Sequence, residues 1–157
     1  MDEPARLYFD DVDIGHEMNA GPYGLTKDEI VGFASRYDPR PFHIDESAAE
    51  ASIFKGLIAA SCHTFAIAQA LGCQCRPELA VQAALGIDEM RLPAPARVGD
   101  QLWFTSTMIE KRPSKSRPGE GVARYQTVLH DDAGAAVLEY KITVLLAGRP
   151  QTPGKSA

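Results

Sequence analysis

The chain has 157 residues, 45% of them hydrophobic, which is enough for one domain with a single sizeable core. Its 16 basic and 21 acidic residues give a formal net charge of -5, and the lack of any basic run argues against a nucleic-acid partner. The acidic start has no apolar signal core, and no segment approaches the roughly 18 apolar residues that span a bilayer, so we expect a cytoplasmic protein without a membrane partner.

The first helix is expected to begin after Thr26, because Thr26 and Glu29 have the spacing of a capping box. Apolar residues follow at helical intervals, at Ile30, Val31, Phe33, Ala34 and Tyr37. Prolines at positions 39 and 41 disfavour helical geometry in the residues before them, so the helix should end at Asp38.

The segment after this helix brings an acid and an imidazole close together in the sequence. His43 follows Asp38 by five positions, and we expect it on a loop stiffened by the two prolines. Five extended residues span roughly 16 Å, so only a bend in the chain can bring the two side chains together. Asp45 is expected to cap a further short helix over "ESAAEA".

A second, longer helix is predicted over "GLIAASCHTFAIAQALG", residues 56–72, with Gly72 at its end. It is apolar on nearly every side, so it should be covered on nearly every side. Four segments rich in β-branched and aromatic residues then predict antiparallel strands at 81–93, 101–112, 121–131 and 135–147. Helices followed by a run of strands indicate an α+β fold in which the sheet wraps around the buried helix.

The three cysteines, Cys62, Cys73 and Cys75, are expected to be ordinary free thiols. An odd number of them in a chain of this size argues against a disulfide framework. A zinc site needs about four ligands at tetrahedral spacing, and the single Cys-x-Cys pair has no second pair to complete it, so we expect no metal.

Three stretches together carry a family resemblance: "FASRYDPRPFHIDESAA", "FKGLIAASCHTFAIAQAL" and "GIDEMRLPAPARVGDQLWFTSTMIEKRPSKSRP". Over roughly residues 7 to 147 the chain resembles the MaoC-like dehydratases, the family of (R)-specific enoyl-CoA hydratases with a hotdog fold. In that family the first motif reads Asp-x-Asn-Pro-hydrophobic-His. Here Asp38, Pro41, Phe42 and His43 match it, and Arg40 stands at the Asn position.

The resemblance implies one hotdog domain over residues 1–148, followed by a flexible tail over 149–157. It implies a catalytic dyad of Asp38 and His43 around a nucleophilic water, with no cofactor beyond the CoA thioester that is the substrate. Arg40 would pair with Asp38 or reach an anionic group of the substrate, or it lies solvated on a turn. The backbone at Ser61 and Cys62 would form the oxyanion hole, although Ser61 is equally an N-cap candidate.

The same resemblance implies a homodimer or a dimer-based oligomer that binds acyl-CoA. Four basic residues beside the loop at 111–121 are candidates for CoA phosphates: Lys111, Arg112, Lys115 and Arg117. Two other functions stay open. A hotdog thioesterase would use the carboxylate to activate water against the thioester carbonyl, and a non-catalytic acyl-CoA-binding module would keep the fold without turnover. The acyl chain and the direction of the reaction stay open as well.

Overall fold

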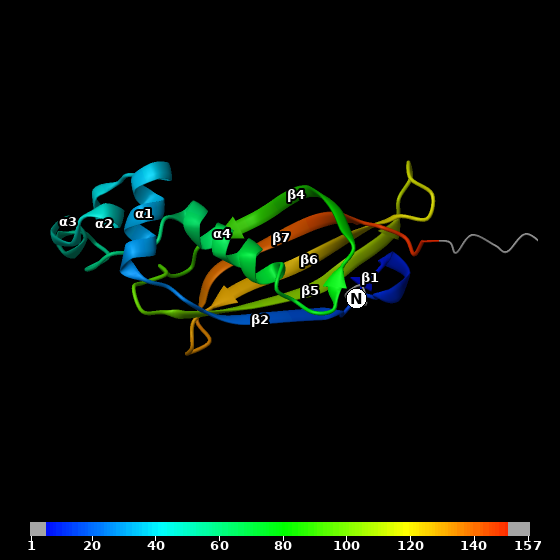
Figure 1. Ribbon diagram of the computed structural model, residues 1–157, viewed down its shortest axis with the longest axis horizontal. Helices are drawn as coiled ribbons and strands as arrows, with labels where there is room; N and C mark the ends of the chain where they lie inside the picture. Colours follow the sequence, from blue (N-terminus) through cyan, green and yellow to red (C-terminus); the bar gives the residue numbers. More distant parts are fainter. Residues whose placement is uncertain (1–5, 151–157) are drawn as a thin grey trace, which may run out of the picture.

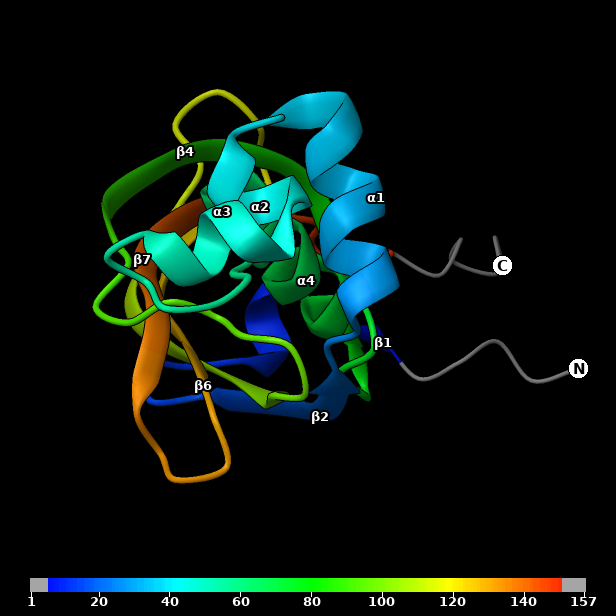
Figure 2. The same cartoon turned by 90° about the vertical axis from the view of Figure 1, so that its left-hand side faces the viewer.

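The computed structural model describes residues 6–150 of the chain. These residues form a five-stranded antiparallel sheet that curves around one long helix, α4, with three shorter helices gathered at one end (Figures 1 and 2). The strands of the sheet are β2 (Glu17–Gly24), β5 (Gln101–Pro113), β6 (Gly121–His130), β7 (Ala136–Leu146) and β4 (Val81–Arg91), in that spatial order. The predicted α+β class and the four predicted strands are confirmed.

The long helix α4 (Ser61–Gly72) packs on the face of the sheet through Ile67, Ala68 and Leu71, which are buried in the core. Its last helical residue is Gly72, as predicted, but it begins five residues later than predicted. Residues 57–60 are instead held by another loop: the amide of Ala59 donates to the carbonyl of Ala96, and Ile58 forms a β-bridge with Arg97.

One side of α4 is not covered within the single chain, contrary to the expectation of near-complete burial. A stripe of small side chains is exposed on it, namely Cys62, Ala66, Ala70 and Cys73. The residues recur every three or four positions, so they lie on one side of the helix. This side therefore remains available for contact with another molecule.

The short helices follow the predicted capping signals. Helix α1 (Lys27–Tyr37) begins after Thr26, whose hydroxyl accepts from the amide of Glu29 at 3.3 Å. Helix α3 (Glu46–Ala51) begins after Asp45, which accepts from the amide of Ala48 at 2.7 Å. Between them lies α2 (Pro41–Ile44), where the sequence predicted a loop. Proline is well suited to the first position of a helix, so Pro41 starts a turn of helix instead of preventing one.

Strand β2 was not predicted from the sequence, because "EMNAGPYG" has few β-forming residues. It lies at the edge of the sheet beside β5, where one side of the backbone needs no partner strand and proline is tolerated. Its register shifts between Ala20 and Tyr23, around Pro22. Two-residue strands β1 (Arg6–Leu7) and β3 (Glu78–Leu79) pair in parallel, and a 3-10 turn, η1 (Phe9–Asp11), follows β1.

None of the helices in the described part of the chain combines the length and apolar character that a membrane span requires. Arg149, the first residue of the predicted tail, forms an ion pair with Asp11. Residues 151–157 of that tail lie outside the described residues.

A tyrosine buried in the sheet, Tyr140, should make the protein less stable at high pH. Burial raises the pKa of Tyr140 from 10.0 to about 12. The unfolded chain therefore loses this proton at a lower pH than the folded chain. The contribution is fully present below about pH 10 and is lost as the pH rises through about 12. We expect the free energy of unfolding, measured by urea titration, to fall over this range, and to fall less steeply in Tyr140→Phe. An equal slope in both proteins would contradict this.

Candidate functional site

A pocket lies where helix α2, the start of α4 and the loop after β4 meet. Helix α2 is at the left-hand end of the molecule in Figure 1. Its polar lining includes Asp38, Arg40, His43, Ser61 and Thr64. Apolar side chains complete the walls, from Phe42, Phe54, Ile58, Ala59 and the segment 92–96. Four of the five residues predicted for the site therefore share one pocket.

The bend that the sequence analysis required is supplied by the chain between α1 and α2. Asp38 ends α1 with φ -156° and ψ 72°, Arg40 is extended, and Pro41 begins α2. This turn places the carboxylate Oδ2 of Asp38 3.6 Å from Nε2 of His43. His43 lies in α2 rather than on a loop, so its ring is held by helical backbone as well as by packing.

The His43 ring is oriented by a hydrogen bond inside the protein. Its Nδ1 lies 2.7 Å from the carbonyl oxygen of Ile58, and a carbonyl only accepts, so Nδ1 carries a proton. In the neutral ring Nε2 then has a free lone pair that faces Asp38. The His43 side chain is 5% exposed and that of Asp38 is 24% exposed. The pair is thus open to the pocket but mostly shielded from bulk solvent.

Arg40 pairs with Asp38, which is one of the contacts predicted for it. Its Nε donates to Oδ1 of Asp38 at 2.9 Å, which leaves Oδ2 for His43. The Arg40 side chain is 67% exposed, so this ion pair contributes little to stability. Its effect is on orientation, because it fixes which carboxylate oxygen faces the histidine.

The start of α4 points unsatisfied amides toward this end of the molecule. The first intrahelical bond is from the amide of Thr64 to the carbonyl of Ala60. The amides of Ser61, Cys62 and His63 precede it and have no acceptor within the helix. Ala60, not Ser61, is the N-cap, and it offers no side-chain acceptor. The N-cap alternative for Ser61 is therefore wrong, while Cys62 is exposed and does not line the pocket.

His63 belongs to a separate cluster behind the pocket. It is buried, its ring stacks on Phe33 with centroids 4.4 Å apart, and its Nε2 lies 3.2 Å from Oε1 of Glu29. The carboxylate of Glu29 also accepts from the hydroxyl of Tyr23. Burial, followed by this contact, raises the Tyr23 pKa to about 12. Glu29 thus connects β2, α1 and α4.

Several contributors to the pocket gave no sequence signal. The Ile58 carbonyl acts through its backbone, which no side-chain pattern reveals. The rings of Phe54 and Phe42 pack at a tilt of 52°, and the rings of Phe42 and His43 form a T-shaped pair. The segment from Leu92 to Ala96 reaches the pocket only because the loop after β4 folds back over it.

The basic loop between β5 and β6 lies at the opposite end of the molecule from this pocket (Figure 1). Lys111 contacts Asp13, and Arg117 contacts Glu120. Within one chain, these residues are too remote to bind a phosphate of a molecule held at Asp38. Within residues 6–150, no three His, Cys, Asp or Glu side chains are grouped to hold a metal ion, and the three cysteines are free.

Comparisons with known proteins agree with this geometry. The sequence matches the family "MaoC like domain" over residues 11–130. A MaoC-like dehydratase from Rhodospirillum rubrum is 33% identical, with a TM-score of 0.87 over 92% of this chain and 99% of that one.

Two more distant structures share the fold. The R-hydratase PhaJ1 from Pseudomonas aeruginosa is 20% identical, with a TM-score of 0.75 and 96% of each chain covered. RV0216 from Mycobacterium tuberculosis, a protein with a double hotdog fold, is 21% identical, with a TM-score of 0.75. The match covers 94% of this chain but only 46% of RV0216.

The curved sheet wrapped around α4 is therefore the predicted hotdog fold. The family match covers most of the chain, and it includes both the Asp38 to His43 segment and the start of α4. The chain belongs to the MaoC-like domain family.

Proposed function

We propose that this protein is an acyl-CoA hydratase or dehydratase that adds water to a trans-2-enoyl-CoA, or removes it, through Asp38 and His43. The observation that carries the proposal is the 3.6 Å separation of Oδ2 and Nε2 in a pocket that also contains the start of α4. Because the substrate is a CoA thioester, the proposal places the protein in the cytoplasm.

In the hydration direction, the oxygen of a water bonds to Cβ of the enoyl group while the π electrons shift toward the thioester carbonyl. A water between Asp38 and His43 would donate one hydrogen to each of Oδ2 and Nε2, the two acceptors that face it. One of them takes the proton as the carbon–oxygen bond forms, and a proton is then delivered to Cα. Dehydration runs through the same steps in reverse.

The thioester oxygen gains negative charge during the reaction and needs hydrogen-bond donors. The free amides at the start of α4 supply them, and Ser61 is the residue there that lines the pocket. The positive end of the helix dipole favours the same charge. The carboxylate, the imidazole and the start of α4 thus each have a role in the proposed reaction.

The decisive experiment is to mix the purified protein with crotonyl-CoA and follow the absorbance of the enoyl thioester. We expect the absorbance to fall as 3-hydroxybutyryl-CoA forms. Release of free thiol from saturated acyl-CoA, with no hydration, would instead identify a thioesterase. Tight CoA binding without any turnover would identify a non-catalytic binding module.

We also propose a homodimer formed through the edge strand β4 and the exposed side of α4. All eleven residues of β4 are exposed, including the large apolar residues Val81, Leu85, Ile87 and Met90. An unpaired edge strand of this length and character is a template for pairing with another strand. A second copy of β4 can satisfy it by two-fold symmetry, and RV0216 carries two hotdog units in one chain.

Light scattering coupled to gel filtration tests the dimer. Wild-type protein is expected at about twice the chain mass of 17.0 kDa. Leu85→Lys combined with Ile87→Lys should give the monomer, because the substitutions place four like charges in one interface. Ile14→Lys, at an even more exposed apolar residue away from β4, is the control and should remain dimeric. A dimeric double variant would contradict this interface.

A further inference from the structure

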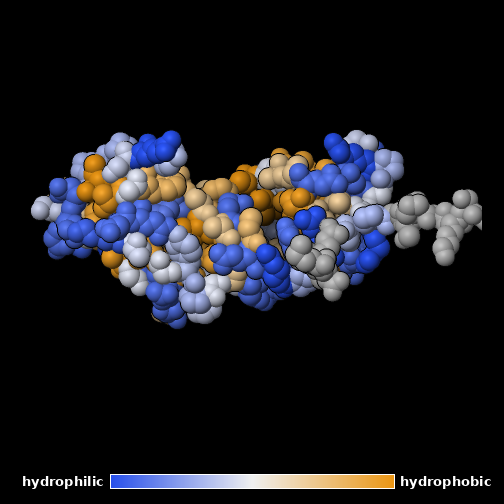
Figure 3. All heavy atoms as spheres, in the orientation of Figure 1, coloured by the Kyte–Doolittle hydropathy of each residue, from blue (hydrophilic) through white to orange (hydrophobic). Residues whose placement is uncertain are grey.

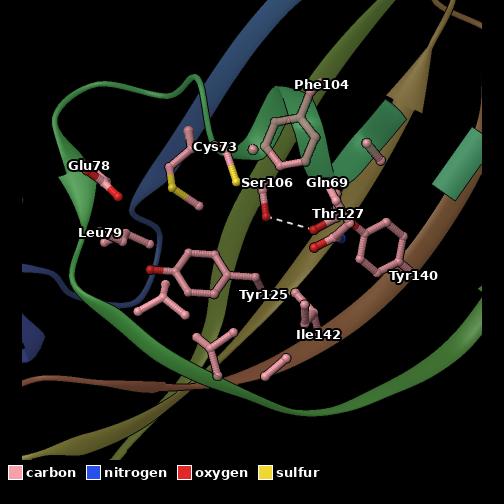
Figure 4. A pocket seen from close by; sticks show the side chains of 16 residues that line it. Gln69, Cys73, Glu78, Leu79, Phe104, Ser106, Tyr125, Thr127, Tyr140 and Ile142 are labelled. Atoms are coloured by element: carbon pink, nitrogen blue, oxygen red, sulfur yellow. Dashed lines mark hydrogen bonds between the residues drawn. The ribbon is translucent and has the colours of Figure 1, made fainter. Parts of the chain in front are cut away.

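A second cavity, of about 330 Å³, lies between the second half of α4, strand β4 and the inner face of the sheet. In Figure 3 a hollow with an apolar rim opens beside α4, where β4 arches over it in Figure 1. Much of the lining is apolar, with Leu79, Phe104 and Ile142 among the residues shown in Figure 4. The floor, however, contains a group of polar side chains.

This polar group is a row across three neighbouring strands. Ser106, Thr127 and Tyr140 are direct cross-strand partners on β5, β6 and β7. The Ser106 and Thr127 hydroxyl oxygens are 2.7 Å apart (Figure 4), and from α4 Nε2 of Gln69 donates to the Tyr140 hydroxyl at 2.9 Å. The next row toward β3 contains Tyr125, flanked by Met108 and Ile142. Burial of polar groups beneath a core helix is costly unless they are hydrogen-bonded, and the side chains of the row are bonded to one another or to Gln69.

The Tyr125 hydroxyl is the part of this group that the protein leaves unpaired. Tyr125 is 1% exposed and lines the cavity, and its hydroxyl has no hydrogen-bond partner among the described residues. Burial raises its pKa, so it is a neutral donor. A buried hydroxyl without a partner is destabilising, whereas a ligand oxygen in the cavity would satisfy it.

The charge of the cavity restricts the ligand further. Among its described lining residues none is basic, and the only charged residue is Glu78. A carboxylate or phosphate would therefore meet no compensating cation and would be repelled by Glu78. A neutral oxygen, such as a hydroxyl or a keto group, fits the donors and acceptors that are present.

The cavity and the Asp38–His43 pocket lie along the same helix. Ser61 and Thr64 line the pocket, and Ala68 and Gln69 line the cavity one turn further on. At 1.5 Å per residue, Ser61 and Gln69 are about 12 Å apart along α4. An acyl chain with its thioester at the start of α4, and running along the helix, would bring its far end to the polar row, beside the neighbouring row that contains Tyr125.

We propose that this cavity receives the far end of the substrate acyl chain and selects a medium-length chain that carries a neutral oxygen there, with Tyr125 as the main specificity determinant. This inference rests on the proposed function, because it assumes an enoyl thioester at Asp38 and His43. It goes beyond that function in naming the acyl group.

The test compares three substrates: crotonyl-CoA, trans-2-decenoyl-CoA and 10-hydroxy-trans-2-decenoyl-CoA. Wild-type protein should show at least a tenfold higher kcat/KM for the hydroxylated chain than for the plain chain of equal length. Tyr125→Phe should abolish this preference by lowering kcat/KM for the hydroxylated chain to that of the plain chain. Tyr8→Phe, the same change outside the cavity, should keep the preference.

Stability provides a second readout. Tyr125→Phe removes an unpaired hydroxyl without changing the ring, so the melting temperature of the free protein should rise by about 2–6 °C. A gain in stability together with a loss of selectivity supports a hydroxyl kept for a ligand. A fall in melting temperature would show that the protein itself pairs this hydroxyl, and would overturn the inference.

The outcomes separate this inference from the proposed function. If crotonyl-CoA is hydrated but the two long chains react equally well, or the plain chain reacts faster, the function stands and the cavity proposal fails. If no enoyl-CoA is hydrated, the function fails. In that case calorimetry measures whether decane-1,10-diol binds to the cavity. Binding that is lost in Tyr125→Phe keeps the cavity as a site for a neutral oxygen, and no binding removes it.

Discussion

Asp38→Asn is expected to lower kcat/KM for crotonyl-CoA by about 10²–10⁴-fold, the usual contribution of a positioned acid or base. The amide keeps the shape of the carboxylate but cannot take a proton from water. His43→Asn should cost a similar factor. The amide nitrogen of Asn lies close to the position of Nδ1, so the hydrogen bond to the Ile58 carbonyl can persist while Nε2 is removed. His43→Ala would instead leave a buried carbonyl unpaired and lower stability as well.

Asp45→Asn is the matched control for this pair, since it makes the same chemical change seven residues away. Asn caps a helix as well as Asp does, so both α3 and the rate should be unaffected. Because Asp38 and His43 act on one water, the double variant should be little slower than the slower single variant. If both single variants fold and keep the wild-type rate, neither Asp38 nor His43 is catalytic.

Ser61→Pro is expected to lower kcat by about 10²–10³-fold through the loss of a single N–H. Ser61 is the first residue of α4, where proline fits the helix and removes only an amide that has no intrahelical partner. The preceding residue, Ala60, has φ -63° and ψ 151°, an extended conformation compatible with a following proline. Stability should be unchanged or slightly higher, as judged by thermal unfolding.

The comparison with Ser61→Ala isolates the backbone from the side chain. Alanine removes the hydroxyl and keeps the N–H, so this variant should retain a rate close to wild type. A slow Ser61→Pro beside a fast Ser61→Ala assigns the oxyanion contact to the backbone. If the alanine variant is the slow one, the hydroxyl makes the contact. Two equally fast variants would exclude residue 61 from the oxyanion hole.

Local signals predicted the parts of the fold that depend on residues close together in the chain. Thr26 and Asp45 cap helices at the predicted positions because a cap involves residues only two or three apart. The prolines fixed the end of α1 for the same reason. The same signals misplaced the start of α4, because residues 57–60 are held by Ala96 and Arg97, nearly forty positions away. They also missed β2, which has little preference of its own and forms by pairing with β5.

The sequence by itself determined the acid and the imidazole, the end of the helix before them and the long apolar helix that follows, since proline geometry, capping and periodicity are properties of short segments. Only the tertiary structure decided which nitrogen of His43 faces Asp38, because the carbonyl that fixes the proton belongs to Ile58 on another loop. It also assembled Ser106, Thr127 and Tyr140 into one row. Such contacts close long loops at an entropic cost, so they form only when the packing of the whole core offsets that cost.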